Sequence, residues 1–161
     1  MEGRAMAAEV APPAQTQGRL ASHAGFWVRF DALLIDLILL SVVGGAVLGV
    51  DPTSPSTPSV VEGVLGVFLL LAYFTYFEGS SSGQTIGKKI LSIRVVDART
   101  QGPIGFTRAL ARNVVAYFVS PILLLGYLWM LWDQERQTWH DKVVSSFVVP
   151  TDANPVERWP G

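Results

Sequence analysis

The segment that decides the fold is residues 32–50, ALLIDLILLSVVGGAVLGV, in which Asp36 is the only charged side chain. As a helix, its roughly 19 residues would extend about 28 Å, enough to cross the hydrocarbon core of a bilayer. Residues 51–59 follow with three prolines and cannot continue the helix, so they predict a short loop outside the membrane. A second apolar run covers residues 60–77. The pattern therefore predicts a transmembrane helical hairpin.

A third apolar stretch, residues 114–132, is interrupted by Pro121 and Gly126. A kinked helix would cross the membrane here, whereas a re-entrant turn at Pro121 would return the chain to its original side. We favour the plain crossing, which would prevent two short β-branched segments, residues 90–97 and 142–149, from pairing as strands. The expected fold class is an all-α membrane protein, a small transmembrane bundle of three apolar segments with short cytoplasmic strands.

Composition agrees with a membrane protein, because half of the 161 residues are hydrophobic and the mean hydropathy is +0.37. Cysteine is absent, which excludes disulfides and thiolate metal ligands. Basic residues gather before the first span and in residues 78–113, so the positive-inside rule places both regions in the cytoplasm. The expected organisation is a disordered cytoplasmic arm over residues 1–24, a transmembrane domain over 25–149 and a flexible tail over 150–161.

A helix with two unlike faces is expected just before the third apolar stretch. Phe106, Leu110 and Val114 fall on one helical face, while Arg108 and Arg112 fall together on another. Such a helix is typical of the boundary between lipid and water.

Asp36 is the most informative single residue. A carboxylate facing lipid costs about 2.5 to 3.5 kcal/mol on insertion scales, so a protein partner or water must meet it. Arg29 is seven positions away, about 10 Å along the axis and too far for an ion pair within one helix, so we expect it to reach the headgroups instead. Asp36 either ties two helices together or, if desolvated, binds and releases a proton or a monovalent cation.

The opposite side of the same helix carries small residues at every fourth position, Ser41, Gly45 and Gly49. This spacing allows a second helix to approach closely. We interpret it as a packing face, either within one chain or between copies of a homo-oligomer.

Catalytic motifs are weak in this sequence. Residues 83–89, GQTIGKK, only approximate a phosphate-binding loop, and we expect Lys88 and Lys89 to contact anionic headgroups instead. His140 precedes Asp141 but no nucleophile accompanies them, so a structural hydrogen bond is expected. We expect no enzyme activity, no cofactor, no metal site and no nucleic-acid binding.

Three blocks in order resemble the RDD family of membrane proteins, which is named for one arginine and two aspartates. The blocks are residues 25–36 (GFWVRFDALLID), residues 83–97 (GQTIGKKILSIRVVD) and residues 136–142 (RQTWHDK). The resemblance assigns Arg29 and Asp36 to the first two named positions, and Asp141 or, as an alternative, Asp133 to the third. It implies a multi-pass plasma-membrane protein, with sodium or proton exchange suggested for some members.

Two functions are therefore considered. The first is a non-enzymatic membrane protein, transport-related or part of a membrane complex, in which Arg29, Asp36 and Asp141 organise the cytoplasmic half of the bundle. The second is a sodium/proton antiporter that acts as an oligomer, because three spans are too few to enclose a pathway. Both place the chain in the lipid bilayer of the plasma membrane with a cytoplasmic N-terminus.

Overall fold

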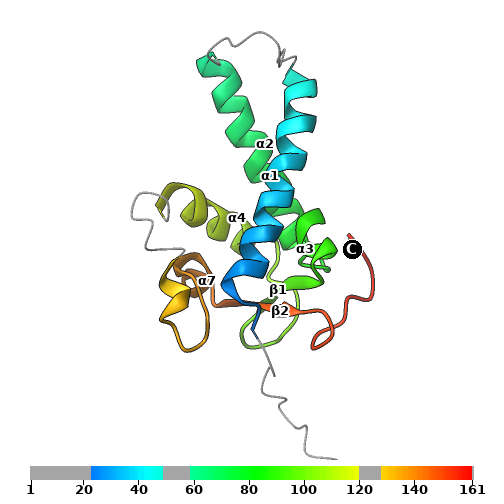
Figure 1. Cartoon of the computed structure of the whole chain (residues 1–161), viewed down its shortest axis with the longest axis vertical. Coiled ribbons are helices and arrows are strands. Elements are labelled where there is room, and N and C mark those ends of the chain that lie inside the picture. Colours follow the sequence, from blue (N-terminus) through cyan, green and yellow to red (C-terminus); the bar gives the residue numbers. More distant parts are fainter. Residues whose placement is uncertain (1–22, 49–58, 120–127, 161) are drawn as a thin grey trace, which may run out of the picture.

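A computed structural model describes residues 23–48, 59–119 and 128–160 of the chain. Two long helices, α1 (Phe26–Leu48) and α2 (Val60–Gly79), form a hairpin that projects from a base made of the remaining elements (Figure 1). The base contains α3 (Ile86–Ile90), α4 (Phe106–Val114) and α7 (Trp139–Val143). It also contains the π-helix η1 (Val115–Val119), the 3-10 helix η2 (Trp129–Leu131) and two strands.

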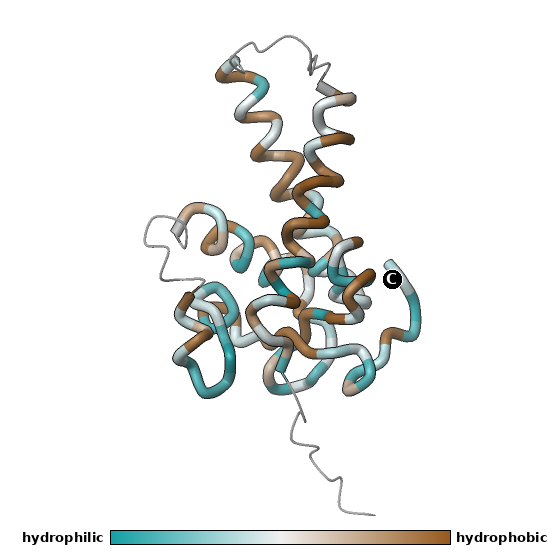
Figure 2. Tube along the Cα trace, viewed as in Figure 1, coloured by the Kyte–Doolittle hydropathy of each residue, from teal (hydrophilic) through white to brown (hydrophobic). Residues whose placement is uncertain are grey.

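The hairpin has the surface of a membrane-embedded element. Both helices are long and apolar enough to cross a membrane. Yet within their most apolar stretches only 11% of the residues of α1 and 6% of those of α2 are buried. A core helix of a soluble protein would be covered instead, so this exposed apolar surface is typical of contact with lipid or with other membrane helices. Figure 2 shows hydrophobic residues along the hairpin and more hydrophilic ones in the base.

Local sequence explains where α2 begins. The Ser59 hydroxyl accepts a hydrogen bond from the Glu62 amide (3.3 Å), and the Glu62 carboxylate accepts one from the Ser59 amide (2.6 Å). This capping box satisfies two backbone donors at the helix start. The prolines before Ser59 end at Pro58, so α2 starts where the sequence predicts.

The base is built on an antiparallel pair of strands, β1 (Ile93–Asp97) and β2 (Ser146–Pro150), in which Val95 lies opposite Val148. The backbone amide of Ala24, just before α1, donates to the Val148 carbonyl (2.9 Å). The entrance to α1 is thereby fixed to the sheet.

This pairing corrects one prediction. A plain membrane crossing over residues 114–132 would separate the strands, but β1 and β2 are hydrogen-bonded and so lie on the same side of any bilayer. Of the three predicted apolar segments, two form helices of spanning length among the described residues. In the third, residues 120–127 lie outside the described part of the chain. The fold is thus mostly helical, with a small sheet.

Helix α4 has the two faces that its sequence predicts. Phe106, Leu110 and Val114 are exposed, whereas Arg112 is 5% exposed. The charged face therefore points into the protein and the apolar face points outward, the reverse of a helix on a soluble protein. That arrangement is typical of contact with lipid.

Residues 151–160, predicted as a flexible tail, contact the base. Arg94 donates to the Asn154 side chain (3.0 Å), and the Trp159 indole donates to the Gln84 carbonyl (3.1 Å). The Trp159 ring also stacks on Phe77, with ring centroids 5.5 Å apart. These contacts hold the segment against β1 and the loop that follows α2.

Candidate functional site

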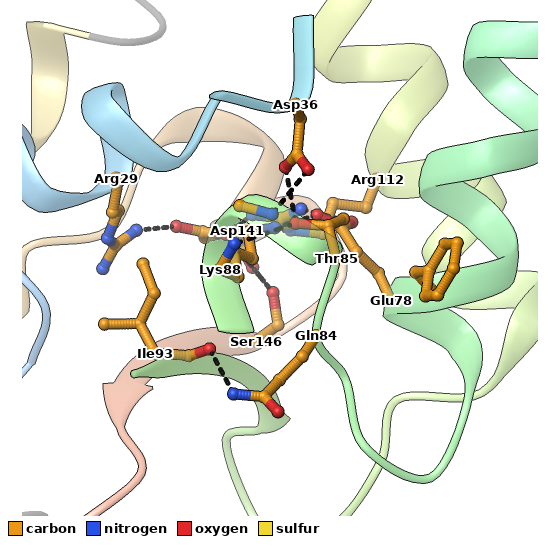
Figure 3. Close-up of polar contacts among 12 residues, drawn as sticks. Arg29, Asp36, Glu78, Gln84, Thr85, Lys88, Ile93, Arg112, Asp141 and Ser146 are labelled. Carbon is orange, nitrogen blue, oxygen red and sulfur yellow. Dashed lines mark hydrogen bonds and ion pairs between the residues drawn. The ribbon is translucent and has the colours of Figure 1, made fainter. Parts of the chain in front are cut away.

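The main polar feature of the base is a chain of five charged side chains, four buried and Arg29 partly buried, which we call the charge cluster. Its members alternate in sign and each comes from a different helix, α3, α2, α4, α7 and α1 (Figure 3). In that order they are Lys88, Glu78, Arg112, Asp141 and Arg29.

Arg112 is the central member of the charge cluster. Its Nη1 donates to Glu78 (2.5 Å), while its Nε and Nη2 donate to Asp141 Oδ1 (3.0 and 2.9 Å). Lys88 forms an ion pair with the other oxygen of Glu78. One guanidinium on α4 therefore binds carboxylates from α2 and α7 at the same time.

Arg29 closes the other end of the cluster. Its Nη1 donates to Asp141 Oδ2 (2.6 Å), and its remaining nitrogens donate to the carbonyls of Ala24 (3.0 Å) and Arg136 (2.9 Å). Every branch of the guanidinium thus has a protein acceptor. Arg29 binds Asp141 and does not extend to the headgroups, which corrects that prediction.

Burial makes the cluster energetically sensitive. Glu78 is 1% and Asp141 0% exposed, and removal of one partner from a buried pair typically costs about 3–5 kcal/mol. Burial alone would raise the pKa of Asp141, but the adjacent Arg112 and Arg29 outweigh it and hold this pKa below its usual range. In the same way, Glu78 and Asp141 overcome burial and raise the pKa of Arg112.

Asp36 forms a second polar site, where α1 meets α2 and α3. It is fully buried and accepts hydrogen bonds from the Tyr73 hydroxyl (2.7 Å), the Thr85 hydroxyl (2.5 Å) and the Gly87 amide (2.7 Å). The Tyr73 oxygen in turn accepts from the Ile86 amide (3.1 Å). The three donors to Asp36 are uncharged, so within the described part of the chain hydrogen bonds and no ion pair hold the carboxylate.

Gly87 allows α3 to approach this carboxylate. A Cβ atom at position 87 would overlap the Ala32 carbonyl and lie 3.0 Å from the Asp36 carboxyl carbon. Gly83 has φ of 62°, and a Cβ there would overlap the Val95 carbonyl. The two glycines of residues 83–89 thus have packing roles. Lys88 is buried against Glu78 and so does not contact headgroups, contrary to the prediction, whereas the exposed Lys89 lies over the Trp159 ring.

The other predicted site residues lie outside these two polar sites. Asp133 pairs with the partly exposed Lys142 and accepts from the Gln137 amide (2.9 Å). Ser41 donates to the Ile38 carbonyl of its own helix (2.8 Å), and Gly45 has open space beside it. Gly49 lies outside the described residues. Of the two candidates for the second aspartate, only Asp141 is in the charge cluster.

Sequence reasoning did not select several residues of these sites. They are Tyr73, Glu78, Thr85, Lys88 and Arg112. The sequence contained a signal for two of them. Glu78 directly follows an apolar run, and Arg112 lies just before another one.

A cavity of about 430 Å³ lies beside the charge cluster, lined by residues of α1, α2, α4, η1 and α7. Aromatic and aliphatic side chains form most of the wall, and it also includes five charged residues of the two polar sites: Arg29, Asp36, Glu78, Lys88 and Arg112. His140 also lines it, and burial lowers the pKa of this histidine to about 3, so its imidazole is neutral at pH 7. In the described ranges, no group of three His, Asp or Glu side chains could hold a metal ion.

Comparison with known proteins identifies a family for this sequence. The model of the RDD family matches residues 23–145. The "Proline-rich antigen homolog" of Mycobacterium tuberculosis (strain ATCC 25618 / H37Rv) is 30% identical over 149 residues, which cover 77% of this chain and 62% of the relative. The "Uncharacterized membrane protein YteJ" of Bacillus subtilis (strain 168) is 26% identical, over 88% of this chain and 89% of that protein. No solved structure matches.

Proposed function

Because the chain belongs to the RDD family of membrane proteins, we propose that it is a non-enzymatic component of a membrane complex whose apolar hairpin packs against other transmembrane helices. The observation that carries this proposal is a difference between the base and the hairpin. The buried charges of the base are bonded to one another, whereas many of the large apolar side chains of the hairpin are exposed.

The exposed surface of the hairpin suits helix packing. Val42 is 67% and Val64 64% exposed, and Gly45, Gly63 and Gly66 have open space beside them. Small residues next to β-branched ones let a second helix approach closely in a membrane. The partner is therefore a transmembrane helix of another protein or of a second copy.

The proposed topology is a multi-pass plasma-membrane protein with the base, and so the N-terminus, in the cytoplasm. Support comes from the basic residues, which concentrate in the base. Since the chain has no cysteine, single cysteines report accessibility without background. A membrane-impermeant maleimide added to intact cells should label Ser59→Cys, and should label Thr100→Cys only after permeabilisation. The reverse labelling pattern would contradict this orientation.

A photo-crosslinking amino acid at Val42 tests the packing proposal in native membranes. The expected result is a discrete adduct with another membrane protein or with a second copy of the chain. The same amino acid at Arg99, an exposed position in the base, is the matched control and should give no such adduct. Adducts with lipid alone at position 42 and at other hairpin positions would refute the proposal.

The second candidate is a sodium/proton antiporter that acts as an oligomer. One observation favours it, namely that Asp36 is buried within α1 and also lines the cavity. In reconstituted vesicles, an imposed sodium gradient should then change the internal pH. Asp36→Asn should abolish this change, and Asp31→Asn, at an exposed position of α1, should not. Absence of flux in the unmodified protein would leave the packing proposal as the function.

A further inference from the structure

We propose that the cavity between α1, α2 and η1 binds one acyl chain of a membrane phospholipid, whose ester carbonyl accepts a hydrogen bond from Asn113. This inference goes beyond the proposed function and does not depend on it. It assigns a ligand to the cavity and a role to a side chain that neither polar site uses.

The cavity has the size and surface of a site for an apolar group. Its volume of about 430 Å³ falls within the roughly 300–1,000 Å³ of small-molecule sites. Leu33, Phe74, Tyr117 and Met130 are among the described residues that form its apolar wall. A hydrocarbon chain is the complement of such a wall, because its burial there removes apolar surface from water.

Asn113 supplies an independent sign of a ligand. The residue lies near the end of α4, is only 2% exposed and lines the cavity. Its amide nitrogen has no hydrogen-bond partner among the residues that the structure describes. Buried donors in folded proteins almost always have an acceptor, so a ligand oxygen in the cavity would satisfy this one.

Charge argues for an uncharged acceptor. With Asp36 added, the charge cluster contains three cationic and three anionic side chains, all bonded within the protein. All of them except Asp141 line the cavity, and each is already bonded to a partner within the protein, so none is left to bind an ionic group. An ester carbonyl is an uncharged acceptor, and in a phospholipid it lies directly next to the acyl chain.

The position of the opening argues for a lipid of the surrounding bilayer. Phe30 lines the cavity and is 45% exposed, and its neighbours on α1, Trp27 and Leu34, are 71% and 47% exposed. At Phe30 the cavity therefore adjoins the exposed apolar surface of α1, which acyl chains would contact in a bilayer. Trp27 is typical of headgroup depth, so a chain can enter here while its headgroup stays at the interface.

The helix geometry next to Asn113 fits a binding role. The chain changes from α-helix to π-helix at Val115, and η1 supplies Ala116 and Tyr117 to the wall. Short π-helical segments are frequent at functional sites because they widen a helix locally.

The test measures phospholipid retained by the full chain after purification in detergent. Native mass spectrometry of the unmodified protein should show one phospholipid per chain. Ala116→Phe fills the cavity and should reduce retention at least tenfold. Ala72→Phe, at an exposed position of α2 outside this cavity, adds the same side chain and should retain lipid as the unmodified protein does.

A second variant keeps the test decisive if Ala116→Phe fails to fold. Asn113→Leu removes the donor at similar volume and should weaken retention about fivefold, as expected for one net hydrogen bond. In phosphatidylcholine nanodiscs, a phospholipid with a diazirine near the end of one acyl chain should label Phe74 and Tyr117. Three results would overturn the proposal: no retained phospholipid, a different retained molecule such as a free fatty acid, or unchanged retention in Asn113→Leu.

Discussion

Arg29 on α1 and Asp141 on α7 are 112 positions apart in the sequence and form an ion pair with an N···O distance of 2.6 Å. Asp141 also accepts two hydrogen bonds from Arg112, so one carboxylate joins the first and last helices of the fold to α4. The stability of the base should therefore depend on this carboxylate more than on any exposed ion pair.

Asp141 and Asp133 provide a matched comparison, because both residues are aspartates with cationic partners. Asp141→Asn leaves two buried cations short of a partner and should lower the free energy of unfolding by about 3–5 kcal/mol. Asp133→Asn breaks a pair with the 42% exposed Lys142 and should cost less than about 1 kcal/mol. Thermal unfolding in detergent measures both, and equal effects would contradict the assignment of Asp141 to the charge cluster.

Loss of Arg112 should also destabilise the chain strongly. Arg112→Met keeps an unbranched apolar stem but removes the guanidinium, which leaves Glu78 and Asp141 each with one cation, at an expected cost of about 3–5 kcal/mol. Arg99→Met is the control, because Arg99 is exposed and lies in a turn of the base. In chemical unfolding, the free energy of unfolding should fall much more for Arg112→Met than for Arg99→Met. A small effect at Arg112 would show that the charge cluster contributes little to stability.

Gly87→Ala should force α3 away from α1. The added methyl group would meet the Ala32 carbonyl and the Asp36 carboxyl, and overpacking of this kind costs about 1–3 kcal/mol. Gly66→Ala places the same methyl in open space on α2 and should leave stability unchanged or raised. The midpoint of thermal unfolding compares the two, and a stable Gly87→Ala protein would mean that the close approach is not required.

His140 should make stability depend on pH. Because burial lowers its pKa from 6.5 to about 3 in the folded protein, the unfolded chain takes up a proton first as the pH falls. Stability is thus fully present above pH 6.5 and is lost below it, by about 1.4 kcal/mol per pH unit for this one proton. His140→Phe should flatten the unfolding free energy between pH 6.5 and 4.5.

The pH comparison controls for the second histidine. Burial also lowers the pKa of His23, but His23 is present in both proteins, so the difference between them belongs to position 140. The carboxylates of Asp141 and Asp97, whose pKa values are lowered from 3.8, contribute only below about pH 4. A slope that His140→Phe leaves unchanged would contradict a buried neutral imidazole.

Much of the fold follows from local sequence. The prolines of residues 51–59 and the apolar runs on either side predict the hairpin, and the spacing of Phe106 and Leu110 against Arg112 predicts the faces of α4. Periodicity is informative here because each pattern reports the environment of one element. The need for a partner at Asp36 follows in the same way, since a buried carboxylate must be bonded.

The partners themselves could not be predicted. Helical spacing shows which side chains share a face of one helix, but Arg29 pairs across more than a hundred residues and Glu78 pairs with a residue of α4. Whether residues 114–132 cross the membrane plainly or turn back depends likewise on a distant contact, the pairing of β1 with β2. Sequence patterning predicted the elements, and only the tertiary arrangement determined which charges meet.

The long separation between Arg29 and Asp141 has a consequence for biosynthesis. At about 5–20 residues per second, the ribosome needs on the order of 6–20 s after Arg29 to complete the 112 residues that end at its partner. During that interval α1 and α2 have already emerged, with the arginine and Glu78 still short of their final contacts. The hairpin is therefore complete before the base can close, and until then the charges of Arg29 and Glu78 must be met by water or by other molecules.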